Sequence, residues 1–358
     1  MADFFEIDFL DVEAKSSGDA ICIRYEVAGQ RYIHVVDGGF QSTGEAVVKH
    51  INAFYDSPAR IEHVVATHND GDHAVGLQNV LETYNVGALW MLRPWVYAEE
   101  LLPRFKNYTN AGNLRSALRK AYSNLAALED IAVRRGITIY EPFQGSVIGA
   151  FRVMAPTRKR FLDLVVDSDK TPVAVDEGAL SLLARALTGI AQKAAALVSA
   201  AWGAEYFPAG ETSNENEMSV VQYAYLSGFK IMLTGDTGRS GLREVIEYAP
   251  LAGLSLPGID RFQVPHHGGR HNVSSELLDQ ILGKKLDQQG SPAKFSAFIS
   301  SAKADEDHPR KSVVRAVIHR GGMVYTTEST SIRTQGGFAP QRSWGPAVPA
   351  AYPEEQES

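Results

Sequence analysis

Histidine and aspartate are concentrated in one short stretch, where residues 67–73 read Thr-His-Asn-Asp-Gly-Asp-His. The stretch follows an apolar, β-branched run over residues 61–66, so it marks a turn from a strand to a helix. Imidazole is a common zinc ligand and carboxylate supplies charge and a hard oxygen, so this mixture suits a divalent ion. The alternative is a solvated turn in which Asp70 or Asp72 caps the next helix. The density of ligand-type residues favours the metal site.

Two later apolar runs also end at polar residues. Residues 229–233 stop at Thr-Gly-Asp, which includes Asp236, and residues 263–264 stop at Pro-His-His-Gly-Gly, which includes His266 and His267. Taken alone, each is an ordinary turn or a hydrogen-bonded loop. Because the carboxyl ends of strands gather functional groups in α/β proteins, we expect all three clusters at one edge of the fold.

The elements that must position these clusters alternate along the chain. Strand-like residues 20–27, 32–36 and 61–67 alternate with helical patterns over 42–55 and 75–84, and Ser42 with Glu45 forms a capping-box pattern. The βα alternation returns after residue 219. Between them, Ala- and Leu-rich segments, notably 113–135 and 177–202, predict a helical insertion over about residues 93–205, interrupted by a strand-like run at 147–154. The sequence predicts an α/β domain over residues 1–335 and a flexible Pro-rich tail over 336–358.

Composition narrows the class of protein. The chain has 358 residues, 44% of them hydrophobic, and a net charge of −7, values typical of a globular protein with a sizeable core. No apolar stretch approaches the roughly 20 residues that span a bilayer, so we expect no membrane insertion. The N-terminus does not resemble a secretory signal and Cys22 is the single cysteine, so we expect a cytoplasmic location. The acidic charge argues against coating nucleic acid, though not against a local basic groove.

Together these motifs resemble the metallo-β-lactamase superfamily, and within it the hydrolase domain of ComEC-type DNA-uptake proteins. The resemblance is carried by His68-x-Asp70-x-Asp72-His73 followed by Gly76-Leu77, by residues 233–236 (Leu-Thr-Gly-Asp) and by residues 264–268 (Val-Pro-His-His-Gly). It extends to Val-Asp-Gly-Gly at 36–39 and to segments 216–220 and 299–309. The superfamily usually has His where this chain has Asp70, a difference that the ComEC-type branch shares. The resemblance implies a four-layer αββα sandwich with a helical insertion.

The resemblance also implies metal ligands. They are His68 and Asp70 for one ion, Asp72 and His73 for a second, Asp236 as a bridge, and His266 or His267 to complete the second site. The superfamily has a further histidine near the position of Asn216, which would bind weakly through its amide oxygen or leave the first site open. Asp37 would orient a ligand histidine. The expected cofactor is therefore one or two divalent ions, Zn²⁺ or Mn²⁺.

Such ions would create a metal-activated hydroxide for attack on phosphorus or a carbonyl. We expect Asp72 to orient the attacking water, Lys303 to stabilise developing charge and His308 to donate a proton; the alternatives are a solvated cation for Lys303 and a helix-start residue for His308. Cations outnumber anions over residues 93–135, which predicts either a solvated helix face or a phosphate-binding lid.

The expected activity is that of a phosphodiesterase or nuclease, with a nucleic acid or nucleotide as the substrate. Two alternatives stay open. One is hydrolysis of a lactone, thioester or amide by the same hydroxide, and the other is a non-catalytic binding or regulatory module on the same fold. The sequence also leaves open whether the insertion serves in a homo-oligomer.

Overall fold

The computed structural model describes residues 2–12, 15–171, 196–290 and 292–358. Its first sheet has the strand order β15-β1-β2-β3-β4-β5-β6. These strands are β1 (Ala2–Phe9), β2 (Ala20–Val27), β3 (Gln30–Gly38), β4 (Arg60–Val65), β5 (Asn85–Trp90), β6 (Thr138–Tyr140) and β15 (Ile332–Gly337). Strands β3 to β6 run parallel, and β1 pairs antiparallel with β2 and β15.

The second sheet has the order β14-β13-β12-β11-β10-β8-β7. Its strands are β7 (Val147–Ile148), β8 (Phe151–Ala155), β10 (Val221–Leu226), β11 (Phe229–Leu233), β12 (Arg261–Gln263), β13 (Phe295–Ile299) and β14 (Gly322–Thr326). Strands β11 to β14 are parallel, and the remaining pairs are antiparallel. A small third sheet joins β9 (Leu197–Ser199) to β16 (Glu355–Glu357).

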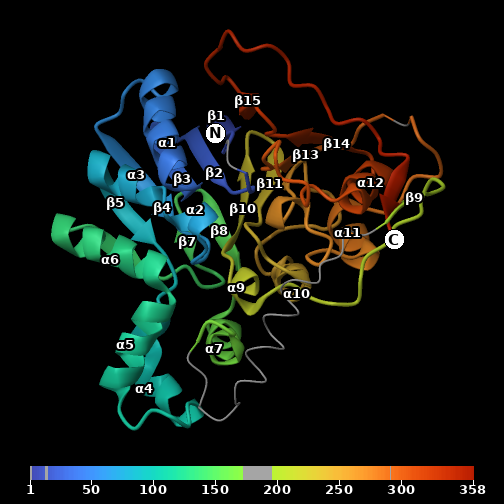
Figure 1. The fold of residues 1–358 in the computed structure, drawn as a ribbon. Coiled ribbons are helices and arrows are strands. Elements are labelled where there is room, and N and C mark those ends of the chain that lie inside the picture. Colours follow the sequence, from blue (N-terminus) through green and yellow to red (C-terminus); the bar gives the residue numbers. More distant parts are fainter. Residues whose placement is uncertain (1, 13–14, 172–195, 291) are drawn as a thin grey trace.

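Helices cover the outer faces of both large sheets (Figure 1). On the first sheet they include α1 (Gln41–Phe54) and α3 (Leu77–Thr83), and on the second α10 (Arg239–Tyr248), α11 (Ser275–Leu282) and α12 (Lys311–His319). Aromatic rings join the inner faces of the sheets: Phe9 stacks on Phe298 with ring centroids 4.7 Å apart, and Phe5 meets Phe229 edge-on at 5.7 Å. The α/β fold with αββα layers, predicted from the sequence, is confirmed. Among the described residues, no helix is both long and apolar enough to cross a membrane.

The helical insertion is only partly as predicted. Helices α4 (Ala98–Leu101), α5 (Ala111–Ala121), α6 (Ser123–Arg135) and α7 (Arg158–Asp167) lie in it, but so do strands β6, β7 and β8 of the two large sheets. Strands β7 and β8 lie on the strand-like run predicted at 147–154, whereas β6, with three residues at a sheet edge, leaves little periodic signal in the sequence. Residues 172–195, which hold most of the predicted helix 177–202, lie outside the described residues, and residues 197–199 form β9.

Helix α1 does not begin with the predicted capping box. It starts at Gln41 with Phe40 at the N-cap position, and no side chain caps it. Ser42 therefore lies inside the first turn. The start of α1 instead packs closely against the chain at Gly76, and this contact requires a glycine at position 44. A Cβ atom on Gly44 would lie 2.3 Å from the carbonyl oxygen of Gly76.

This glycine contact also fixes the end of β3. A Cβ atom on Gly76 would lie 1.9 Å from the carbonyl oxygen of Gly38, far inside van der Waals contact. The amide of Gly76 instead donates a 2.9 Å hydrogen bond to the carbonyl of Gly39. The chain between β4 and α3, which holds the predicted ligand loop, is thereby held against the end of β3.

The C-terminal segment packs on the domain, in contrast to the flexible tail expected for residues 336–358. Arg342 donates hydrogen bonds of 2.8 Å to Glu6 and 3.0 Å to Asp8, both buried in β1. Glu357 accepts bonds of 2.9 Å from the first amides of α12, at Lys311 and Ser312. The prolines indicate a segment without a core of its own, but its charged side chains dock on groups far away in sequence.

The contact of Arg342 compensates buried charge. Burial raises the pKa of Asp8, but a hydrogen bond and charge from His50 and the charge of Arg342 outweigh it and hold that pKa below its usual range. Arg24 and Arg333 also pair with Glu6. The carboxylates of β1 thus depend on cations from three parts of the chain.

Replacing Arg342 by Ala should lower the free energy of unfolding by about 3 kcal/mol, because it leaves buried carboxylates short of a cation. Urea unfolding followed by circular dichroism measures the loss. Arg243→Ala is the control, since Arg243 is half-exposed and lies 3.7 Å from Glu211; its cost should stay below about 0.5 kcal/mol. Equal costs for the two variants would contradict a structural role for the C-terminal segment.

A second buried carboxylate, Glu205, couples residues 196–213 to α12. It accepts hydrogen bonds of 2.8 Å from His319 and from Arg320, and its side chain is fully buried. Burial raises the pKa of Glu205, but these hydrogen bonds outweigh it and lower the pKa to about 2. The ionised form is therefore the one that stabilises the fold.

A carboxylate with a lowered pKa stabilises the protein above its unfolded pKa and loses that contribution as the pH falls toward its folded pKa. Between about pH 5 and about pH 2, wild-type protein should lose up to about 3 kcal/mol of stability through this group alone. The stability gap between wild type and Glu205→Gln, measured by urea unfolding, should therefore shrink across this range. Glu99→Gln, at an exposed position, should run parallel to wild type, and a constant gap for Glu205→Gln would contradict the assignment.

Candidate metal centre

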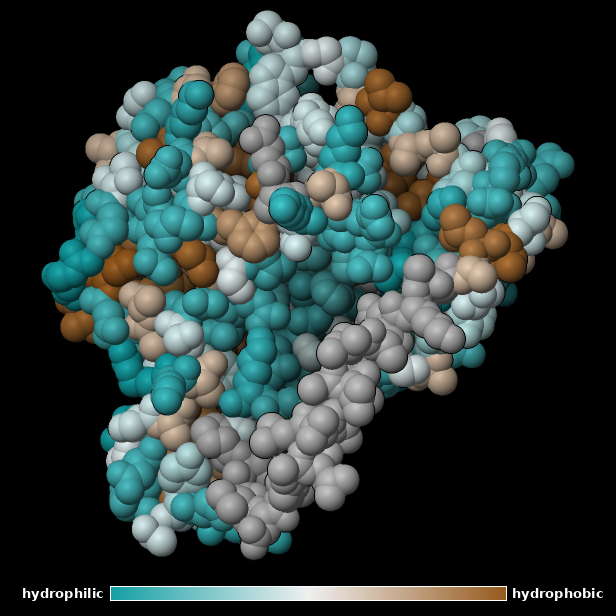
Figure 2. Space-filling model, viewed as in Figure 1, coloured by the Kyte–Doolittle hydropathy of each residue, from teal (hydrophilic) through white to brown (hydrophobic). Residues whose placement is uncertain are grey.

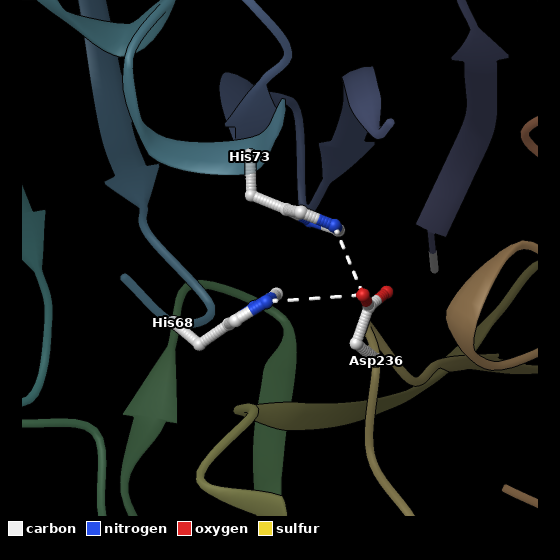
Figure 3. A group of neighbouring side chains, drawn as sticks. All are labelled: His68, His73 and Asp236. Carbon is white, nitrogen blue, oxygen red and sulfur yellow. Dashed lines mark ion pairs between the residues drawn. The ribbon is translucent and has the colours of Figure 1, made fainter. Parts of the chain in front are cut away.

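The predicted ligand residues meet where the two sheets face each other. His68 follows β4, Asp72 and His73 lie on the short helix α2 (Gly71–Ala74), Asp236 follows β11, and His267 follows β12. Figure 3 shows His68 and His73 pointing at Asp236 from the opposite side of the sandwich. The nearest oxygen of Asp236 lies 3.3 Å from Nε2 of His73 and 3.8 Å from Nε2 of His68.

Each cluster histidine is held by its outer nitrogen. Nδ1 of His73 donates to Asp37 at 2.9 Å, and Nδ1 of His267 donates to the carbonyl oxygen of Ser300 at 2.9 Å. Nδ1 of His68 lies 3.0 Å from the hydroxyl of Thr67. These contacts leave the three Nε2 atoms facing the cluster, where they are buried and have no hydrogen-bond partner among the described residues. Inward-facing, unpartnered Nε2 atoms are what metal-ligating histidines require.

Asp37 has the position expected of a residue that orients a ligand. Its carboxylate accepts from the amide of Thr67 at 2.8 Å and from the Thr67 hydroxyl at 2.6 Å, in addition to His73. It therefore fixes both the ligand loop and the ring of His73.

The carboxylates of the cluster favour positive charge on the groups around them. Burial raises the pKa of Asp236, but the charges of His73 and His267 outweigh it and hold that pKa well below its usual range. Conversely, burial lowers the pKa of His73, while Asp236 and Asp72 outweigh it and raise that pKa well above its usual range. Protons on the imidazoles or a bound cation can supply this charge, and metal binding releases such protons.

Several overlapping groups of three side chains could each hold an ion, with ligand atoms within 4.8 Å of one another. They are His68, His73 and Asp236; Asp72, His73 and His267; Asp19, Asp236 and His267; and Asp19, Asp37 and His73. Four residues, Asp19, His73, Asp236 and His267, each belong to more than one group. Such overlap fits one ion or two neighbouring ions, and the donor set of imidazole and carboxylate suits Zn²⁺ or Mn²⁺.

Asp19 was not predicted as a ligand. It is buried, its Oδ2 accepts from Gln263 at 2.8 Å, and its Oδ1 has no partner among the described residues. Its amide donates to the carbonyl of Asp72 at 3.1 Å, and a Cβ atom on Gly18 would lie 2.5 Å from that carbonyl. The signal in the sequence is the Gly-Asp pair directly before the apolar strand β2, on the amino side of a strand rather than the carboxyl side.

His266 and His267, either of which could be the ligand by sequence, occupy different positions in the structure. His267 is buried in the cluster, 3.4 Å from Asp72. His266 lies at the rim with 28% of its side chain exposed, and its Nδ1 faces Asn272 at 2.9 Å. Both residues have a left-handed backbone, with φ values of 50° and 52°. Such strain costs about 1–2 kcal/mol per residue and concentrates at functional sites.

The other predicted site residues lie at different distances from the cluster. Asp70 is at the rim, with Oδ2 3.8 Å from His68, and its side chain does not cap helix α2. The amide nitrogen of Asn216 donates to Thr212 at 2.8 Å and lies 3.4 Å from His266. The ring of His308 lies 5.3 Å from that of His266. Lys303 is exposed, and no described contact joins it to the cluster.

Comparison with known proteins supports the fold. Residues 24–137 match the sequence profile of the Metallo-beta-lactamase superfamily, and the chain has the fold of that superfamily. The profile describes the superfamily as a whole and does not single out its ComEC-type branch. No curated protein matches the chain.

Solved structures resemble the chain at low identity. A mutant of the CmlA beta-hydroxylase is 12% identical with a TM-score of 0.42, over 92% of this chain and 53% of that one. A possible metal-dependent hydrolase from Veillonella parvula is 8% identical with a TM-score of 0.40, over 93% and 99%. The hydrolase AbOPH is 10% identical with a TM-score of 0.33, over 67% and 71%. The chain thus spans about half of the first of these structures.

Asp236→Asn should remove most of the bound metal, since it replaces the carboxylate shared by two of the ligand groups with a neutral amide of the same shape. Metal content of purified protein, measured by mass spectrometry after loading with Zn²⁺ or Mn²⁺, tests this. His271→Gln is the control, because His271 contacts the carbonyl of Gly210 outside the cluster, and it should bind metal as wild type does. Equal metal content in Asp236→Asn would show that the cluster is not the metal centre.

Proposed function

We propose that this protein is a metal-dependent hydrolase and that its substrate is a phosphodiester. The observation that carries the proposal is the convergence of three buried, unpartnered Nε2 atoms on the carboxylates of Asp236 and Asp72. Burying this many ionisable groups together is costly unless positive charge from a bound cation or from protonated imidazoles compensates the carboxylates. A cluster of this kind at loop ends is characteristic of a catalytic site rather than of structural packing.

The five buried or half-buried ligands His68, Asp72, His73, Asp236 and His267, together with Asp19, would hold the metal. Divalent ions bound there lower the pKa of a water molecule toward neutrality and neutralise charge that develops on the substrate. The protein's own task is to position the reacting groups. Asp72 is the cluster carboxylate that reaches the open side, with 26% of its side chain exposed, and it is the residue that we propose orients the attacking water.

His308 stands beside this open side. Its Nδ1 lies 3.2 Å from Asp305, which also accepts hydrogen bonds from the amide and hydroxyl of Ser17. Burial lowers the pKa of His308 to about 4, assisted by the charges of His267 and His266. The imidazole is therefore neutral near pH 7. This favours a role as a hydrogen-bond acceptor through Nε2 over the role of proton donor that was predicted from the sequence.

The surroundings of the cluster support a charged substrate. Figure 2 shows a hollow lined by hydrophilic residues near the centre of the face seen in Figure 1, where α2 and α9 (Asn214–Glu217) lie. Several cations of the insertion are already matched by carboxylates: Arg104 pairs with Asp163, Arg119 with Glu129, and Arg134 with Glu82. The cations of residues 93–135 therefore fit a solvated helix face better than a phosphate-binding lid.

One observation favours the alternative of a lactone, thioester or amide substrate. A cavity beside His68 is lined mainly by apolar side chains, among them Leu92, Leu125, Phe161 and Met218. Its volume is about 10 Å³, room for roughly one water molecule. An acyl group would need a much larger space, so this cavity supports the alternative only if it opens.

Purified protein loaded with Mn²⁺ or Zn²⁺ should cleave bis(p-nitrophenyl) phosphate and single-stranded DNA. Asp236→Asn should reduce kcat at least about 100-fold, because it removes the shared ligand. His308→Gln should reduce kcat by about 100-fold on both substrates alike, because a hydrogen-bond acceptor at Nε2 would act on the attacking water and not on the leaving group. A metal-loaded protein that cleaves neutral lactones or thioesters but no diester would overturn the phosphodiester proposal, and one that binds no metal would favour the non-catalytic module.

A further inference from the structure

We propose that Lys170 binds the anionic group of the substrate at the rim of the metal centre. This inference rests on the proposed hydrolase function and names a residue that the ligand motifs do not contain. Lys170 lies a hundred positions from Asp70 of the ligand loop in the sequence. Its ammonium group nevertheless forms an ion pair with the carboxylate of Asp70.

The turn that carries Lys170 is anchored on both sides. It follows helix α7, and both Ser168 and Thr171 are buried. The hydroxyl of Ser168 bonds to Glu215 and accepts from the amide of Lys170 at 3.1 Å. The hydroxyl of Thr171 lies 3.1 Å from that of Tyr122. The backbone position of Lys170 is therefore held by these contacts and does not depend on the ion pair with Asp70.

The contact at the end of that side chain is easily exchanged. The side chain of Lys170 is 41% exposed and that of Asp70 is 30% exposed. A solvent-accessible ion pair of this kind contributes little to stability. When Asp70 turns toward a metal ion, or when an anionic substrate arrives, the ammonium group can move to a substrate oxygen without disturbing the turn.

The position of Lys170 matches the needs of a phosphoryl group. Asp70 lies 3.8 Å from His68, and His68 lies 3.8 Å from Asp236, so the ammonium group stands one carboxylate away from the buried ligands. Among the described residues, Lys170 is the one lysine or arginine that pairs with a carboxylate of the cluster or its rim. A non-bridging phosphate oxygen placed at the metals would therefore find its cation here.

A purely structural role predicts a different result. If Lys170 only holds Asp70 in place, its loss should weaken metal binding and reduce activity on every substrate equally. If Lys170 binds the substrate, its loss should spare metal content and affect anionic ligands selectively. The two roles can therefore be separated by measuring metal content and two substrate classes on the same variants.

The experiment compares Lys170→Gln and Lys170→Arg with Lys159→Gln in the full-length, Mn²⁺-loaded protein. Lys159 lies on α7 with 88% of its side chain exposed and pairs with Asp163, so it is a matched control for charge. The measurements are metal content, kcat and KM on bis(p-nitrophenyl) phosphate and on p-nitrophenyl acetate, and calorimetric binding of inorganic phosphate.

Lys170→Gln should raise KM for the diester and the dissociation constant of phosphate about tenfold, the loss of one charge-assisted hydrogen bond. It should leave metal content and acetate hydrolysis unchanged. Lys170→Arg should retain most phosphate affinity, and Lys159→Gln should match wild type. Reduced metal content in Lys170→Gln, an equal loss on both substrates, or unchanged phosphate affinity would each overturn the inference.

Failure of the proposed function would look different. Wild-type protein would then not cleave the diester at all, whereas phosphate binding would still report on Lys170. Phosphate affinity that falls in Lys170→Gln in a protein without diesterase activity would support the anion site and overturn the phosphodiesterase. If wild type and Lys170→Gln bind phosphate equally and the wild type cleaves the diester, the phosphodiesterase proposal is supported and the anion site at Lys170 is overturned.

Discussion

The arrangement of this fold depends on a group of buried carboxylates that must be matched by positive charge. Asp236 and Asp72 lie among three imidazoles, and they raise the pKa of His73 well above its usual range. Neither of the two large sheets supplies all of these residues. His68, Asp72 and His73 come from the first sheet's loops, while Asp236 and His267 come from the second. A cation bound at the cluster would therefore join the two halves of the sandwich, so that metal binding and the packing of the sheets would stabilise each other.

The surrounding residues serve mainly to hold these ligands in one orientation. Asp37 accepts hydrogen bonds from His73 and from the amide of Thr67, and the close contact between Gly38 and Gly76 holds the following turn against the end of β3. On the other sheet, the carbonyl of Ser300 fixes His267 on a left-handed backbone. Ligands held by second contacts lose little freedom when a metal binds, because their rings are already oriented. The left-handed backbone at His266 and His267 is the strained conformation that accompanies this orientation.

The sequence predicted those parts of the protein that local patterns determine. Apolar strands ending at Asp and His clusters identified His68, His73, Asp236 and the pair at 266 and 267, because side chains at the carboxyl ends of parallel strands meet at one edge. It missed Asp19, which enters from the opposite end of a strand. It also missed β6, which is too short for a periodic signal, and the docked C-terminal segment, whose Arg342 contacts a residue 334 positions away. Contacts at such separations leave no local pattern to read.

The buried residues of the cluster and the residues at its rim differ in how far their side chains are constrained. The three buried histidines are constrained from both sides, since Nε2 faces the cluster and Nδ1 contacts Thr67, Asp37 or the carbonyl of Ser300. The rim is not constrained in this way. Asp70, Lys170, His266 and His308 each reach solvent, and they come from four different segments of the chain. Their side chains can vary without altering the core of the site, which is how one fold supports different reactions. In the proposed hydrolase, the attacking group would therefore be generated in the buried cluster, and the substrate would be selected by the cations and imidazoles at its edge.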